Sequence, residues 1–204
     1  DPRTLLPYLS TSHTEDAENT LALGKYQFPL SGGKVELLRR GQAFWDVLEQ
    51  NGVETTIIRM PANFPPSGTA TREISGMGTP DILGSYGTFS FYTEDLAAFE
   101  GSDVSGGDVF PVTVRDNEVR AFLQGPRNPF LVKPEKVKAE FTVYLDPDRP
   151  AAKIVLGDEE VLLEEGGWSG WVPVELDLIP TQSLSVMCRF YLKEVRPVFQ
   201  LYAT

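Results

Sequence analysis

The sequence predicts a β-dominated α+β fold, with a short α/β-like portion over residues 1–95 and an antiparallel β-sandwich or barrel-like domain over residues 102–204. The chain of 204 residues contains 18 Gly and 16 Pro, and 11% of its residues are aromatic, a composition that favours turn-rich β structure. Short apolar runs separated by turn signals recur about every ten residues after Gly101, as in sandwiches and barrels. A hydrophobic content of 41% suffices for a real core.

The first half of the chain predicts one helix and one strand. Residues 5–9 form an apolar anchor and residues 30–34 a turn, and this opening stretch is expected to be extended chain lying on another surface. Residues 42–51 have helical periodicity that ends before Gly52, a residue suited to a left-handed helix terminus. The Val-, Thr- and Ile-rich run 53–60 follows as a strand stopped by Pro61. Helix, glycine turn and strand make half of an α/β unit.

The loop that follows this strand is the best place for ligand contact. Residues 61–87 are rich in Pro, Gly, Ser and Thr, and so long a connection is uncommon in a compact domain unless it has a function or lies against a partner. Ligands of α/β sheets bind beyond the carboxyl ends of the strands. Arg59 is therefore the predicted partner of a phosphate, and Asn63 is predicted to hydrogen-bond a substrate oxygen; the alternative is a proline-stiffened surface loop with a structural arginine.

The second half predicts a series of short strands. Two tight turns, Asp116-Asn117 and Gly157-Asp158, are each flanked by apolar runs and predict hairpins. Further strands are predicted over residues 137–145, 171–178, 184–192 and 198–202.

Charge and composition argue against several classes of protein. A formal net charge of -11 repels phosphate backbones and anionic lipids, so no nucleic-acid partner is expected. No run approaches the roughly 18 apolar residues that a membrane-spanning helix needs, so no membrane insertion is expected. The single cysteine, Cys188, is expected to be a buried small hydrophobe, and the single histidine, His13, a solvated surface residue.

No catalytic or metal-binding constellation is recognisable. Residues 31–34, Ser-Gly-Gly-Lys, lack the spacing of a phosphate-binding loop, and residues 167–170, Gly-Trp-Ser-Gly, lack that of a nucleophile elbow. The run that begins at Asp146 starts like a calcium loop but has Ala151 and Gly157 at the positions of the turn glycine and the bidentate Glu. The carboxylates of residues 158–160 and 164–165 are expected to form a solvated face. No catalytic residue, metal ligand or cofactor site is assigned.

Three segments resemble the middle of bacterial alkaline-phosphatase-superfamily proteins of the type I phosphodiesterase/nucleotide pyrophosphatase kind: residues 41–48 (GQAFWDVL) with 52–56 (GVETT), residues 60–66 (MPANFPP) and residues 75–81 (SGMGTPD). The resemblance covers residues 41–92 best. It implies hydrolysis of phosphomonoesters or phosphodiesters by two divalent metals, usually zinc, with a Thr or Ser nucleophile. His13 alone does not supply the histidine ligands of such a site, and Asp81 lacks the histidine that should follow it.

The resulting hypothesis is a non-catalytic internal segment, an insert or cap, of a metal-dependent phosphoesterase. Its partner would be the remainder of the polypeptide, with the nucleophile before Asp1 and most metal ligands after Thr204. The alternative is a free-standing β-sandwich module that binds a carbohydrate or protein ligand through Trp168, Trp171, Tyr191 or Tyr202, although aromatic residues in strands more often fill cores. The sequence leaves localisation open, including a periplasmic or secreted location through the longer protein.

Overall fold

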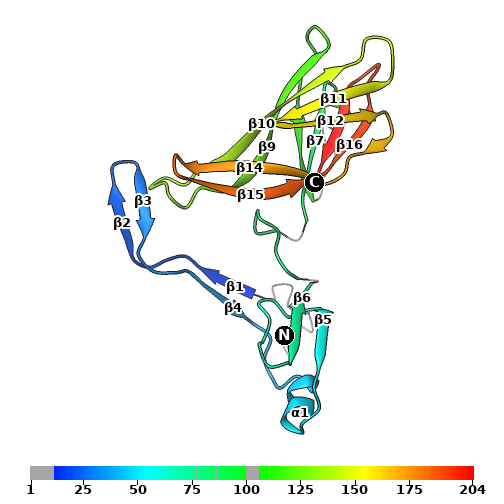
Figure 1. Ribbon diagram of the computed structural model, residues 1–204. Coiled ribbons are helices and arrows are strands. Elements are labelled where there is room, and N and C mark those ends of the chain that lie inside the picture. Colours follow the sequence, from blue (N-terminus) through cyan, green and yellow to red (C-terminus); the bar gives the residue numbers. More distant parts are fainter. Residues whose placement is uncertain (1–11, 77, 86, 100–105) are drawn as a thin grey trace. The chain divides into compact units, whose positions relative to one another are not determined.

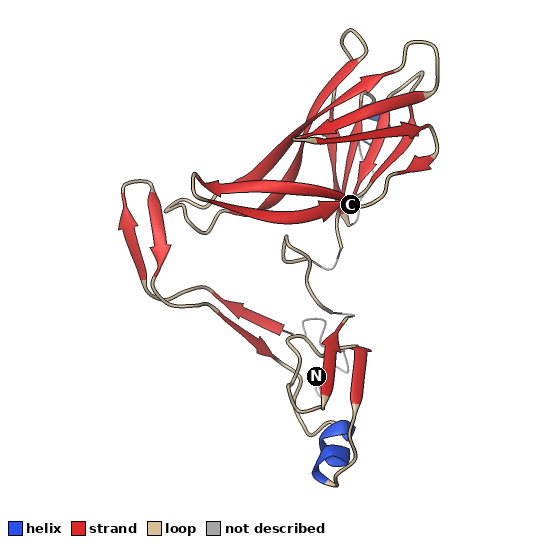
Figure 2. Cartoon of the chain, in the orientation of Figure 1, coloured by secondary structure: helices blue, strands red, loops and turns tan. Residues whose placement is uncertain are grey.

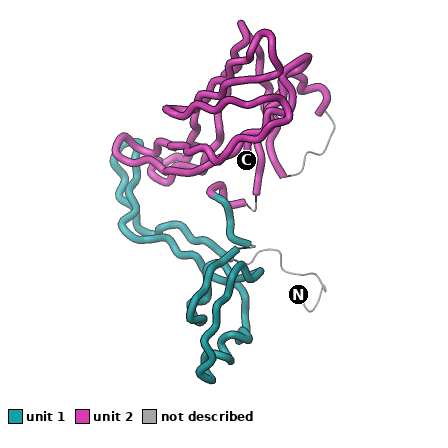
Figure 3. The backbone as a smooth tube through the Cα atoms, turned by 45° about the vertical axis from the view of Figure 1, so that its right-hand side comes forward, with its two compact units in different colours: residues 1–81 teal, residues 82–204 magenta. Residues whose placement is uncertain are grey.

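The protein folds mainly into β-strands, and we describe it from a computed structural model that covers residues 12–76, 78–85, 87–99 and 106–204. Strands account for 51% of the described residues and helix for 5%, which confirms the β-dominated α+β fold (Figure 2). The chain forms two compact units, unit 1 over Asp1–Asp81 and unit 2 over Ile82–Thr204 (Figure 3). This boundary precedes the expected one at 95–102 because β7 (Phe89–Thr93) pairs with strands of unit 2.

Unit 1 begins with a two-stranded antiparallel arm (Figure 1). Its strands are β1 (Ser12–Glu15), which pairs with β4 (Lys34–Leu37), and β2 (Thr20–Leu23), which pairs with β3 (Tyr26–Pro29). The predicted turn at residues 30–34 connects β3 to β4, and a Cβ on Gly33 would lie 2.7 Å from the carbonyl oxygen of Glu15. The glycine therefore allows a close backbone approach within the arm. The predicted apolar anchor at residues 5–9 lies outside the described residues.

The predicted helix and strand of unit 1 are both present. Helix α1 (Phe44–Gln50) begins where the backbone N–H of Ala43 donates to the Asp46 carboxylate at 2.8 Å, and Gly52, with a φ of 75°, follows its end. Strand β5 (Thr56–Met60) comes next and pairs in parallel with β6 (Arg72–Ser75). Ala43 and Trp45 bury one face of β5 by packing around Ile57.

Unit 2 is built from two sheets and a hairpin (Figure 1). A four-stranded antiparallel sheet has the order β12-β11-β10-β9, a five-stranded sheet has the order β13-β16-β17-β7-β8, and β14 pairs with β15. The elements not yet bounded are the 3-10 helix Ala97–Phe99 and strands β8 (Gly107–Pro111), β9 (Glu118–Arg127), β10 (Lys136–Leu145), β11 (Ala151–Leu156), β12 (Glu159–Glu164), β13 (Gly167–Trp168), β14 (Val172–Ile179), β15 (Gln182–Cys188), β16 (Phe190–Glu194) and β17 (Gln200–Ala203).

Two strand predictions for unit 2 require correction. A tight turn does occur at Asp116 and Asn117, which have φ values of 51° and 58°, but its flanking strands β8 and β9 belong to different sheets. Strand β8 instead pairs in parallel with β7, so the five-stranded sheet is mixed rather than wholly antiparallel. The strand predicted over residues 184–192 is divided at Arg189 between β15 and β16. The hairpin around Gly157-Asp158 is confirmed as β11–β12.

One hydrophobic core joins the sheets of unit 2. Along β10, buried residues alternate with more exposed ones, as expected of a strand with one face in a core. Phe141 of this strand contacts Tyr92 of β7 and Phe190 of β16, with ring centroids 5.2 and 5.3 Å apart. Cys188 is buried in the same core, as predicted, and burial raises the pKa of its thiol to about 12. These contacts across both sheets give unit 2 its sandwich-like character.

Candidate functional site

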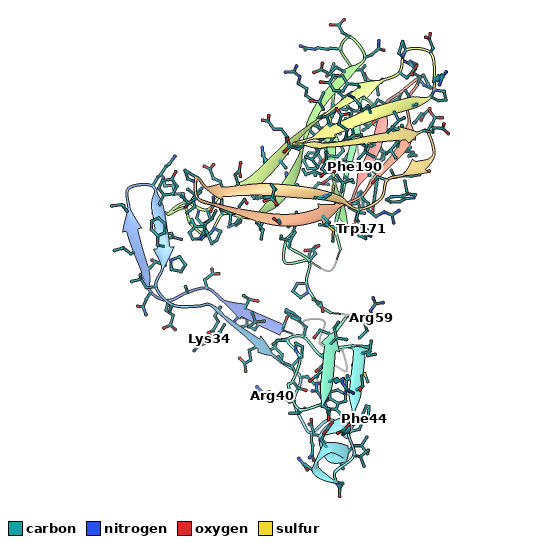
Figure 4. The ribbon with its side chains drawn as sticks, in the orientation of Figure 1. Lys34, Arg40, Phe44, Arg59, Trp171 and Phe190 are labelled. Carbon is teal, nitrogen blue, oxygen red and sulfur yellow. The ribbon has the colours of Figure 1, made fainter. Side chains whose placement is uncertain are left out.

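Arg59 lies near the carboxyl end of β5, as the sequence predicts, and its side chain is exposed (Figure 4). The pairing of β5 with β6 shifts register between Ile58 and Met60, which places Arg59 at a bulge. Its φ of 54° is left-handed, and a Cβ on Gly76 would lie 2.5 Å from the Cβ of Arg59. The bulge therefore changes the direction of the Arg59 side chain near the end of the strand. The residue at position 76 has to be glycine because a Cβ there would clash with Arg59.

Asn63, in contrast, is turned into unit 1 and is 0% exposed. Its Nδ2 donates to Oε1 of Glu73 on β6, and its backbone oxygen accepts from the Ser75 hydroxyl. Its Oδ1 is buried and has no hydrogen-bond partner among the described residues. The structure shows no contact that joins Asn63 to Arg59 among the described residues. Asn63 thus holds the loop in place, whereas Arg59 is the residue of this pair that faces outward.

Glu73 fixes the loop between β5 and β6. Its carboxylate accepts hydrogen bonds from the backbone N–H of Ser67 at 3.1 Å, the Ser67 hydroxyl at 2.9 Å and the backbone N–H of Gly68 at 2.8 Å, in addition to the bond from Asn63. Burial acts to raise the pKa of Glu73, but these donors outweigh it and the pKa is lowered. An ionised Glu73 is therefore part of the folded loop.

Two carboxylates of α1 attach the same loop to the helix. Glu49 accepts from the hydroxyls of Thr55 at 2.5 Å and Thr71 at 2.8 Å and from both of their backbone N–H groups, and these bonds lower its pKa to about 2. The Thr69 hydroxyl donates to Asp46, and this bond, followed by the one from Ala43, lowers the pKa of Asp46. The loop formed by residues 61–71 is therefore held to strand β6 and helix α1 by hydrogen bonds.

The groups considered for catalysis or metal binding have separate local contacts within their own units. Among the described residues, no group of three or more His, Cys, Asp or Glu side chains is placed to hold a metal ion. His13 is exposed on the arm, with its Nε2 3.8 Å from Glu15. Asp146 accepts from the backbone N–H groups of Asp148 and Arg149, both at 2.9 Å, which closes a turn. The chain's described residues therefore do not fit the metal pair that the phosphoesterase resemblance implies.

The described residues of unit 2 line open surface hollows that include one of about 490 Å³ and one of about 480 Å³. The first is lined by Arg115 and Asp116 of the β8–β9 connection and by Arg120 of β9. The second is lined by several carboxylates, among them Glu140, Asp158 and Glu175. Neither includes Arg59 or Asn63.

In the part of the chain that the structure describes, no helix has the length and apolar character needed to cross a membrane.

The aromatic residues considered for ligand binding are brought together on the five-stranded sheet of unit 2. Trp168 and Tyr191 have ring centroids 5.0 Å apart, and Trp168 and Tyr202 have centroids 5.7 Å apart. The Arg189 guanidinium lies 5.0 Å from the Trp168 ring and 5.6 Å from the Trp171 ring. These residues are not in the core, where strand aromatics more often lie; Trp168 is 47% and Trp171 63% exposed. The structure therefore collects a surface aromatic cluster from β13, β16, β17 and the segment before β14.

Several residues that build these sites were not singled out in the sequence. Glu49 and Glu73 have no motif, because their partners are up to 22 residues away along the chain. Arg189 could have been singled out from the sequence, because it is a single charged residue between Cys188 and Phe190 in an otherwise apolar run. A charge in that position marks the point where the chain leaves one hairpin and joins another sheet.

Fold and site together define a β-rich chain with a small parallel α/β-like unit and a sandwich-like unit that carries a surface aromatic cluster. No known protein family, curated protein or solved structure matches this chain.

Proposed function

We propose that this chain is a non-catalytic segment of a larger metal-dependent phosphoesterase of the alkaline phosphatase superfamily. Unit 1 would complete the α/β core of that enzyme, and unit 2 would shape or cover its substrate cleft. The observation that carries the proposal is the incomplete state of the parallel sheet in unit 1.

Among the described residues, that sheet has two strands, β5 and β6, and helix α1 packs on one of its faces. On the other face, Ile58 and Ile74 are directly paired and are 67% and 59% exposed. Parallel sheets are normally covered on both faces and consist of more strands, because two strands bury too little apolar surface. A larger sheet with its own covering layer would bury this isoleucine pair, which supports the view that unit 1 is a portion of an α/β domain.

The arm of unit 1 has the same character. Leu21, Leu23 and Leu30 are 58%, 72% and 69% exposed. A two-stranded arm is only marginally stable in water without a surface to pack on. The leucines therefore support the expectation that this stretch lies on another part of the protein.

The assignment to phosphoesterases rests on the sequence resemblance in residues 41–92. The exposed Arg59 near the carboxyl end of a parallel strand supports it, since substrates of α/β proteins bind at that edge and a guanidinium pairs well with phosphate oxygens. Left-handed φ values of 54° at Arg59 and 56° at Ala62 concentrate backbone strain at the same point. No reaction step is assigned to this chain.

The test compares hydrolysis of p-nitrophenyl phosphate and bis-p-nitrophenyl phosphate, with added zinc or manganese, by this chain and by a longer polypeptide that contains it. We expect turnover by the longer protein only. In the longer protein, Ile58→Lys with Ile74→Lys should abolish soluble active enzyme, whereas Leu162→Lys, at a 76% exposed site of unit 2, should not. Metal-dependent turnover by the 204-residue chain alone would contradict the proposal, as would full activity of the double variant.

A further inference from the structure

The outer face of the five-stranded sheet carries a row of aromatic side chains in direct register. Trp168 of β13 is opposite Tyr191 of β16, Tyr191 is opposite Tyr202 of β17, and Tyr202 is opposite Phe91 of β7. Residues directly opposite each other in neighbouring strands share one face of the sheet. Leu192 and Leu201, the next pair along β16 and β17, belong to the core, so the aromatic row lies on the opposite, outer face.

The rings of this row form a continuous layer. Besides the contacts of Trp168 with Tyr191 and Tyr202, the Tyr202 ring stacks on Phe89 with a centroid distance of 5.2 Å. Phe91, at the β7 end, is only 8% exposed, so the accessible part of the row crosses three neighbouring strands, a length of about 10 Å from the spacing between strands. The layer is therefore extended and one side chain wide.

Arg189 fixes one end of the row. Its Nε and Nη2 donate to the backbone oxygen of Ser169 at 3.2 and 3.1 Å, and its guanidinium contacts the rings of both Trp168 and Trp171. The two tryptophans are held in defined positions by cation–π contacts although they are 47% and 63% exposed. Because these contacts already restrict the tryptophan side chains, little side-chain conformational entropy is lost when a ligand binds.

The residues that border the row are polar or charged. Arg189 lies immediately before β16 and Lys193 lies within it, with the Lys193 ammonium 5.4 Å from the Phe91 ring. The strip is one ring wide and has hydrogen-bonding groups along its edges. Its area is smaller than the roughly 800 Å² per partner that is typical of stable protein interfaces. Nucleic acid bases also stack on aromatic rings, but the net charge of -11 opposes their phosphates.

We propose that this row, made of Trp168, Trp171, Tyr191 and Tyr202 with Arg189 at its end, binds an uncharged carbohydrate chain. The C–H face of a sugar ring is apolar and stacks on an aromatic ring, while its hydroxyl and ring oxygens accept hydrogen bonds from arginine or lysine at the border. A neutral chain is not repelled by the acidic protein. This binding site goes beyond the phosphoesterase proposal and does not depend on it.

The experiment measures retention of the 204-residue chain on insoluble cellulose, chitin and xylan, followed by calorimetric titration with soluble oligosaccharides of the polymer that retains it. We expect retention on at least one polymer and a change in tryptophan fluorescence on binding. Trp171→Ala should weaken binding by about tenfold, the upper end of the contribution of one stacked ring. Trp168→Ala should weaken it by at least as much.

The matched control is Tyr144→Ala, which removes a 44% exposed aromatic side chain from β10 of the other sheet and should leave affinity unchanged. Because Trp171 is 63% exposed, its variant is expected to fold, which circular dichroism and thermal unfolding would check. The proposal is overturned if no polymer retains the wild-type chain, if Trp171→Ala and Trp168→Ala bind as well as wild type, or if the tryptophans instead mediate self-association without sugar binding.

Discussion

At the scale of single residues, buried polar groups decide whether the loop of unit 1 keeps its conformation. Asn63 is the clearest example, because its side chain is 0% exposed and its amide nitrogen donates to Glu73. The acceptor is a carboxylate, and a hydrogen bond to a charged group contributes more to stability than a bond between neutral groups. Asn63 should therefore matter more for stability than the exposed Arg59.

Asn63→Ala should lower the stability of unit 1 by about 1.5–3 kcal/mol, the usual contribution of a hydrogen bond to a charged group. The measurement is urea unfolding followed by Trp45 fluorescence in a Trp168→Phe, Trp171→Phe background, since Trp45 is the tryptophan of unit 1. Asn19→Ala, at an exposed position of the arm, should change stability by less than about 0.5 kcal/mol. Equal effects of the two variants would contradict the structural role of Asn63.

The carboxylates that brace the loop predict acid sensitivity. Glu49 has a pKa of about 2 in the folded chain against 4.5 for the unperturbed group, and the pKa values of Asp46 and Glu73 are lowered as well. Since the unfolded chain binds these protons more readily, the stabilisation is fully present above pH 4.5 and is lost as the pH falls towards about 2.

Unit 1 should accordingly loosen between pH 4.5 and about 2, and the indole N–H resonance of Trp45, which donates to Ser67 and Thr69, would report the change. In Glu49→Gln the uncharged amide does not titrate, so a smaller dependence on pH over this interval is expected. A pH profile of Glu49→Gln identical to that of wild type would show that this carboxylate does not stabilise the fold.

At the scale of elements, the packing of the β14–β15 hairpin against the four-stranded sheet depends on a glycine. Gly125 is buried on β9, and a Cβ there would lie 2.5 Å from Cγ2 of Val137 and 2.8 Å from Cδ1 of Leu176. Val137 belongs to the neighbouring strand β10 and Leu176 to the β14–β15 hairpin. The absence of a side chain at Gly125 thus lets the hairpin pack against the four-stranded sheet.

Gly125→Ala should destabilise unit 2 by about 1–3 kcal/mol, as insertion of a methyl group into a well-packed core forces its neighbours to move. Thermal unfolding of the variant is the measurement. Gly170→Ala is the control, because nothing lies within 4 Å of the Cβ it would gain and its φ is not left-handed. A neutral Gly125→Ala would mean that the hairpin packs less tightly than described.

At the scale of the whole molecule, the two units differ in the size of their cores. The buried residues of the main cluster all lie between Tyr92 and Ala203, within unit 2. The cluster of unit 1 consists of Ala43, Trp45 and Ile57 with two partly buried neighbours. Since apolar burial is the main driving force of folding, unit 2 has the means to fold by itself and unit 1 has much less.

A chain shortened to residues 82–204 should unfold in one cooperative transition with urea, at the same midpoint as the Trp168 and Trp171 signal of the full chain. Residues 1–81 alone should unfold at a lower urea concentration, because much less apolar surface is buried in unit 1. Loss of the cooperative transition from residues 82–204 would show that unit 2 needs unit 1 to fold.

The local elements were predictable from the sequence. Helix α1, strand β5 and the β11–β12 hairpin depend on periodicity, on the glycine that follows a helix and on a Gly-Asp turn, and such signals lie within a few residues of the element they define. The β-dominated class follows from the same signals summed along the chain. The exposed position of Arg59 at a strand end also agrees with the sequence prediction.

The tertiary structure alone decided which strands pair and which side chains meet. The parallel pair β7–β8 and the division of a predicted strand at Arg189 arise because an apolar run can pair with several others, and only the shared core selects among them. The inward turn of Asn63 depends on Glu73, which is 10 residues away, and the aromatic row depends on the register of β13, β16, β17 and β7. Composition and local pattern thus determined the kind of structure, whereas long-range pairing determined its surfaces, because register places each side chain on one face or the other.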